Sequence, residues 1–163
     1  MNTGSLFYGF KSTGRVASFG LKMVFLPITN PTTFFWEYAR SMTKFEQVPS
    51  PSALAEALKL SHHQPVLFFK HSNSCGISQR AFAEFERYLD LPESSAVHHY
   101  VIVVQTAREA SNELARLLRV QHESPQAILV KDGRAVWHDS HLALKSGALK
   151  SAVSHNLTAD DFS

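Results

Sequence analysis

The sequence predicts one α/β domain in which helices flank a central mixed sheet of four strands. Three apolar runs, at 66–70, 97–105 and 127–130, have the length and the β-branched and aromatic content of buried strands. Segments with apolar residues at helical spacing separate these runs, as expected where one parallel strand crosses over to the next. The dipeptide Asp132-Gly133 lies between the third run and a shorter one, and such a pair favours a hairpin turn.

The elements follow one another in an order that narrows the choice of fold. A leading helix is predicted after Ser50, which offers an N-cap hydroxyl, with Pro51 at the first helical position. In chain order the remaining elements are a strand at 66–70, a helix from Cys75 to about 90–92, a strand at 97–105, a helix at 108–119, strands at 127–130 and 136–137, and a helix at 144–155. A helix followed by βαβα, a β-hairpin and a final helix is the order of the thioredoxin fold.

The chain divides by composition into an N-terminal extension and a regular body. We expect residues 1–44 to be an extension that is disordered or not translated, 45–156 to be the thioredoxin-like domain, and 157–163 to be a tail. An organelle transit peptide is an alternative for the acid-poor N-terminal segment, whereas its apolar run is too short and too interrupted for a secretory signal. It also lacks the roughly 20 apolar residues of a membrane span.

Charge and cysteine content exclude several classes of function. The net charge is only +2, and four basic residues against one acid in residues 1–41 leave the body near neutral, without a basic stripe for nucleic acid. The single cysteine excludes an internal disulfide and a thiolate-built zinc site. This cysteine usage suits a reducing compartment, so a cytoplasmic location without membrane association is expected. The nine histidines are not joined by carboxylates at motif spacing, so we expect no metal.

Cys75 is the candidate catalytic residue because it lies at the junction of a buried strand and a helix. Unpaired amides and the positive end of the helix dipole at that position favour a thiolate, which is the nucleophilic form of cysteine. A lone intracellular cysteine is more often a small buried hydrophobe. Here the neighbours Asn73, Ser74, Gly76 and Ser78 are small or polar, which favours the functional interpretation.

Two side chains near Cys75 have possible supporting roles. Ser78 lies one helical turn after Cys75, where a dithiol oxidoreductase would hold its second cysteine, so any disulfide formed must be mixed. The Ser78 hydroxyl could donate a hydrogen bond to the thiolate, or it could be an ordinary serine on the helix surface. His71 is expected on the loop before Cys75, where it is either a group that stabilises the thiolate or a polar loop residue.

Ser124-Pro125 precedes the strand at 127–130. X–Pro bonds are cis in only about 5–6% of cases in folded proteins, so the dipeptide alone predicts a trans turn. In a thioredoxin fold, however, this position holds a cis-proline whose preceding residue offers its backbone to the bound partner. Given the predicted fold, we expect the bond to be cis.

The chain resembles the YtxJ-like monothiol bacilliredoxins in three separated segments, FKHSNSCGIS, VIVVQTAREASNELA and HESPQAILVKDGRAVWHDSH. The resemblance covers roughly residues 45–153. It implies a thioredoxin-like protein that reduces mixed disulfides between bacillithiol and client proteins, with bacillithiol as thiol co-substrate. Cys75 would attack the bacillithiol sulfur and release the client thiol, and a second bacillithiol or another redoxin would regenerate it.

The same resemblance implies an active-site turn made of Gly76, Ile77 and Ser78, and a cis-proline pair at Ser124-Pro125. The family often has proline directly after the cysteine, where this chain has Gly76. Two other functions stay open. Cys-Gly-Ile-Ser differs by one residue from the Cys-Gly-Phe-Ser of monothiol glutaredoxins, which bind an iron–sulfur cluster, although the chain lacks their later glycine pair and Cys-Asp. The other alternative is a non-catalytic thioredoxin-fold binding module.

Overall fold

The computed structural model describes residues 44–157. The expectations for the extension before Lys44 and for the tail after Leu157 therefore lie outside the described residues. Leu157 itself, which we assigned to the tail, is only 8% exposed and packs in the hydrophobic core. Within residues 44–157, no helix combines the length and the apolar character needed to cross a membrane.

The predicted α/β class and order of elements are confirmed, but the predicted strand count is wrong. The described strands are β1 (Glu46–Gln47), β2 (Val66–His71), β3 (His98–Val103), β4 (Gln126–Lys131) and β5 (Arg134–Ser140). They form one sheet in the order β1-β3-β2-β4-β5, so there are five strands rather than four. The missed strand, β1, has two residues that pair in parallel with β3, and two residues are too few to show a strand period in a sequence.

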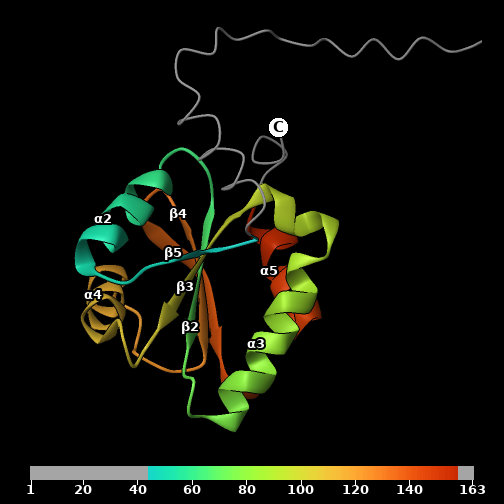
Figure 1. The fold of residues 1–163 in the computed structure, drawn as a ribbon. Coiled ribbons are helices and arrows are strands. Elements are labelled where there is room, and N and C mark those ends of the chain that lie inside the picture. The colour runs from blue at the N-terminus through green and yellow to red at the C-terminus, as the bar shows by residue number, and fades with distance from the viewer. Residues whose placement is uncertain (1–43, 158–163) are drawn as a thin grey trace, which may run out of the picture.

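Four α-helices in the described part of the chain cover the two faces of the sheet, as Figure 1 shows. Helices α2 (Pro51–Leu60) and α4 (Arg108–Leu118) lie on one side, and α3 (Gly76–Leu89) and α5 (Ser146–Asn156) lie on the other. The central strand β2 pairs in parallel with β3 and antiparallel with β4. Its side chains alternate between the faces, so Leu67 and Phe69 pack with α3 and α5, whereas Val66 and Phe68 pack with α2 and α4.

The start of α2 and the hairpin form where local sequence signals predicted them. Ser50 is the N-cap of α2, its hydroxyl oxygen accepts the backbone N–H of Ala53 at 3.3 Å, and a proline begins the helix. In the hairpin between β4 and β5, Asp132 and Gly133 have φ of 51° and 70°, the left-handed values that a two-residue turn requires. The Asp132 and Gly133 N–H groups donate to the carbonyl and the hydroxyl of Ser61, which docks the turn on the end of α2.

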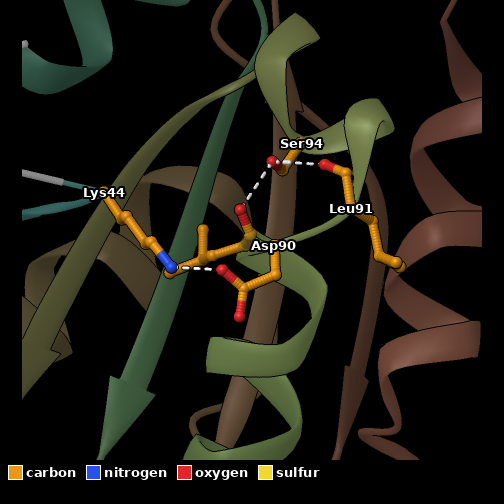
Figure 2. Close-up of polar contacts among 5 residues, drawn as sticks. Lys44, Asp90, Leu91 and Ser94 are labelled. Atoms are coloured by element: carbon orange, nitrogen blue, oxygen red, sulfur yellow. Dashed lines mark hydrogen bonds and ion pairs between the residues drawn. The ribbon is translucent and has the colours of Figure 1, made fainter.

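Figure 2 shows how the chain entering β1 is tied to the far end of α3. Lys44 forms an ion pair with Asp90, the residue that caps the C-terminus of α3. Just beyond, in the 3-10 turn η1 (Pro92–Ala96), the Ser94 hydroxyl donates to the carbonyl of Leu91 at 2.8 Å and to that of Leu89 at 3.1 Å. These contacts lie at the end of α3 remote from Cys75, so they stabilise the helix without shaping its N-terminus.

Candidate active site

Cys75 lies at the N-terminus of α3, as the sequence predicts. It is the N-cap residue, with extended backbone angles (φ −115°, ψ 119°), and its side chain is half-buried. The Cys75 carbonyl accepts the Gln79 N–H at 3.0 Å, while its side chain makes no capping hydrogen bond. The amides of the first helical turn are therefore not satisfied by the cap side chain, and they can stabilise negative charge on the sulfur.

The surroundings of Ser78 and His71 differ from those that the sequence predicted. Ser78 is fully buried, so the expectation of a helix-surface serine is wrong. Its hydroxyl accepts the Ser72 N–H at 2.8 Å and lies 3.0 Å from Nδ1 of His71. His71 is the last residue of β2 rather than a loop residue, because the strand extends one residue beyond the apolar run.

The surroundings of His71 favour a neutral imidazole. The ring is half-buried and packs against Phe82 of α3 with centroids 4.7 Å apart. Burial lowers the pKa of His71, and hydrogen bonds with Ser78 and Asn73 only partly oppose this effect. In the neutral ring, Nδ1 can accept a hydrogen bond from the Ser78 hydroxyl, so His71 Nδ1 and Ser78 Oγ satisfy each other within the protein. Among the described residues, the hydrogen bonds of the Ser78 hydroxyl therefore run to the loop and the strand, and not to the cysteine sulfur.

The residues around the start of α3 are largely open to solvent. Ser74, Gly76 and Ile77 are all exposed, and Ile77 is a large apolar side chain that is 43% exposed. A Cβ built on Gly76 would contact nothing within 4 Å, so the space above the first helical turn is empty. A side chain at position 76 would therefore meet no steric obstacle.

The Ser124–Pro125 peptide bond is cis, and Pro125 is buried directly before β4. The register pairs Gln126, the next residue, with Lys70 near the end of β2, which places the proline close to the loop that leads to Cys75. The Pro125 carbonyl accepts the His141 N–H at 3.0 Å. The Ser124 hydroxyl is buried and has no hydrogen-bond partner among the described residues.

Gln105 is a site residue that the sequence analysis missed. We predicted it as the end of a strand, but β3 ends at Val103 and Gln105 lies in the following turn. Its side-chain amide hydrogen-bonds three consecutive residues of the loop before Cys75, namely Ser72, Ser74 and the backbone of Asn73. The only available signal was its position after a strand parallel to β2, because carboxyl ends of parallel strands meet at one edge of the sheet.

Comparison with known proteins identifies the family. Residues 46–149 match the model of a family described as monothiol bacilliredoxin BrxC. This match covers more than half of the chain and includes Cys75 and Pro125. The chain belongs to the monothiol bacilliredoxin family.

Solved structures agree with the fold of this bacilliredoxin. A thioredoxin-fold protein proposed to be an oxidoreductase matches with a TM-score of 0.58 and 28% identity, over 65% of this chain and 90% of the other. Thioredoxin from Fasciola hepatica matches with a TM-score of 0.57 and 15% identity, over 69% of this chain and 100% of the other. Thioredoxin from Malassezia sympodialis matches with a TM-score of 0.57 and 16% identity, over 69% of this chain and 91% of the other. The thioredoxin fold predicted from the sequence is thus confirmed.

Family and fold together support a thiol redox function for this bacilliredoxin. The chemistry available at the site agrees with it, since the only cysteine of the chain lies half-exposed at a helix N-terminus. Within residues 44–157, the structure groups no three His, Cys, Asp or Glu side chains in a way that could hold a metal ion.

Proposed function

We propose that this bacilliredoxin reduces mixed disulfides between bacillithiol and cytoplasmic proteins, with Cys75 as its single nucleophile. The observation that supports the proposal most directly is the place of the only cysteine. Cys75 is half-exposed at the N-terminus of α3, where first-turn amides can stabilise the negative charge of the thiolate that attacks disulfides. The family to which the chain belongs carries the same monothiol chemistry in its description.

The proposed reaction proceeds by two exchanges. The Cys75 thiolate attacks the bacillithiol sulfur of the mixed disulfide, a new Cys75–bacillithiol disulfide forms, and the client cysteine leaves as a thiolate. The thiolate of a second bacillithiol then attacks the bacillithiol sulfur on Cys75, which releases bacillithiol disulfide and restores Cys75. A second cysteine is absent from the chain, so no internal disulfide can compete with the second step.

In this proposal the neighbours of Cys75 bind and orient the client. The backbone around Ser124 and cis-Pro125 would pair with the extended segment that carries the mixed disulfide. The exposed Ile77 would contact apolar atoms beside it. Ser78 and His71 would support the turn from behind, because their hydrogen bonds connect α3 to the end of β2.

The decisive experiment is intact-protein mass spectrometry after separate exposure to bacillithiol disulfide and glutathione disulfide. We expect a bacillithiol adduct on the wild-type protein, formed faster than the glutathione adduct, and no adduct on Cys75→Ser. With a bacillithiolated reporter enzyme, the wild-type protein should restore reporter activity, and Cys75→Ser should lower the rate by more than about 10³-fold.

Wild-type protein previously alkylated with iodoacetamide serves as the matched control, because it keeps the native sequence and blocks only the sulfur. A faster reaction with glutathione disulfide would reject bacillithiol as the co-substrate while leaving thiol exchange intact. If Cys75 formed no adduct with either disulfide, the enzymatic proposal would be wrong and a non-catalytic binding module would be favoured.

A further inference from the structure

Gln105 joins the turn after β3 to the loop that carries Cys75. Its Nε2 donates to the hydroxyl oxygen of Ser72 at 2.7 Å and to that of Ser74 at 3.0 Å. Its Oε1 accepts the backbone N–H of Asn73 at 3.3 Å. One exposed amide therefore bridges three consecutive residues that lie some thirty positions earlier in the chain.

The bridged loop is in turn connected to Cys75 itself. The Ser72 carbonyl accepts the Cys75 N–H at 3.4 Å, and the Ser72 N–H donates to Ser78 Oγ at 2.8 Å. Cys75 has extended, non-helical backbone angles, so its position depends on the loop before it as well as on the helix after it. Movement of the loop would therefore move the sulfur relative to the first-turn amides.

We propose that Gln105 is a positioning residue for Cys75: its amide holds the 72–74 loop so that the sulfur faces an incoming disulfide in line. This inference rests on the proposed function, since it concerns the attack of Cys75 on a disulfide. Attack requires three sulfur atoms close to one line, and a misplacement of about 1 Å can cost on the order of 100-fold in rate.

Because the hydrogen bonds of the Gln105 side chain are exposed, a role in positioning Cys75 can be distinguished from a role in stabilising the fold. Gln105, Asn73 and Ser74 are exposed, so water can replace each lost hydrogen bond and the cost in stability is small. A positioning role therefore predicts a large loss of exchange rate with little change in melting temperature. A structural role predicts that rate and melting temperature fall together.

The experiment compares the full-length wild-type protein with Gln105→Ala, Gln105→Glu and Thr106→Ala. The measured quantities are the second-order rate constant for reduction of a bacillithiolated reporter and the melting temperature. Thr106→Ala is the matched control, because Thr106 lies in the same turn and, within residues 44–157, its hydroxyl donates only to the Val103 carbonyl. We expect Gln105→Ala to be slower by roughly ten-fold, with a melting temperature within about 3 °C of the wild type.

Gln105→Glu tests geometry and charge separately. The carboxylate can still accept the Asn73 N–H, and the hydroxyls of Ser72 and Ser74 can donate to it, so the bridge is retained while a negative charge is added near the thiolate. We expect Gln105→Glu to keep more of the wild-type rate than Gln105→Ala, because it retains the bridge, and its remaining deficit to shrink at high salt, where the added charge is screened.

The outcomes separate this inference from the function on which it rests. If Gln105→Ala matches Thr106→Ala in rate, or loses rate only in proportion to stability, the positioning role is overturned and the proposed function stands. If the wild-type protein itself does not reduce the reporter, both proposals are overturned.

Discussion

Lys70 is an unusual residue because the central strand β2 buries its side chain completely. It lies on the α2 and α4 face of the sheet, where its ammonium is 3.4 Å from Nδ1 of His122. Burial lowers the pKa of Lys70 to about 8, since the interior disfavours the charged form. At neutral pH the protein therefore keeps an ammonium group in its interior at a cost in stability.

We predict that Lys70→Met stabilises the protein. Methionine fills similar space without a charge to desolvate, so the free energy of unfolding at pH 7 should rise by on the order of 1–3 kcal/mol. The folded pKa lies below the unfolded one, so the unfolded chain binds more protons between about pH 8 and 10.5. The free energy of unfolding of the wild type should therefore rise as the pH increases through that window. In Lys70→Met this rise should be absent.

Urea unfolding of both proteins at pH 7 and at pH 9.5 measures the effect of Lys70. Lys59→Met is the control, because Lys59 is exposed on α2 and its ion pair in the described part of the chain is with Glu56, one turn earlier. A variant Lys70→Met that is less stable than the wild type at pH 7 would show that the ammonium has a compensating partner in solution.

Among the secondary-structure elements, a side chain of α3 caps the N-terminus of α5. The N-cap residue of α5, Lys145, makes no capping hydrogen bond with its side chain. Instead, Glu84 of α3 accepts the backbone N–H of Ser146, the first residue of α5, at 3.0 Å. This backbone hydrogen bond is the main reason why the pKa of Glu84 is lowered. The carboxylate therefore fastens the two helices of one layer to each other.

We predict that Glu84→Ala lowers the melting temperature by a few degrees, because α5 loses its cap. The folded pKa of Glu84 is depressed, so its contribution is present above the unfolded pKa and is lost as the pH falls through the folded value. Differential scanning calorimetry should show the largest difference in melting temperature between wild type and variant at pH 7, and this difference should shrink toward pH 3. Glu86→Ala, an exposed change on the same helix, should show no such difference.

At the scale of the whole molecule, a buried histidine lies in the layer between the sheet and α3. His99 of β3 is 6% exposed, and its Nε2 is 3.3 Å from the hydroxyl of Tyr88. Burial, reinforced by the neighbouring His98, lowers the pKa of His99 to about 3. Protonation of this side chain in acid therefore opposes the packed state of the entire layer.

We predict that His99 makes the protein sensitive to acid. The unfolded chain binds more protons between about pH 6.5 and about pH 3, so stability falls as the pH falls through this window, by up to about 1.4 kcal/mol per pH unit. His99→Gln should flatten this dependence in urea unfolding, although its stability at pH 7 is lower. His155→Gln, an exposed histidine, should leave the slope unchanged. Equal slopes in all three proteins would contradict the assignment to His99.

Features that depend on local periodicity and local backbone preferences were predictable from the sequence. Apolar spacing placed Cys75 at the start of a helix, Ser50-Pro51 marked the beginning of α2, and Asp132-Gly133 marked the hairpin. These signals are readable because each arises from residues a few positions apart. The resemblance to the monothiol bacilliredoxins could also be recognised from the sequence, in three segments that follow one another in the expected order.

Which side chains meet near the cysteine depends on tertiary packing, so it could not be predicted from local signals. The pairing of β1 with β3, the burial of Ser78 beneath the loop, and the reach of Gln105 to that loop all join residues far apart in the chain. Such contacts depend on sheet register and on how helices pack over the strands. The sequence around a polar residue does not indicate which distant residue will be its hydrogen-bond partner. The place of the proposed nucleophile at the start of α3 could thus be predicted from the sequence, whereas the groups around it could not.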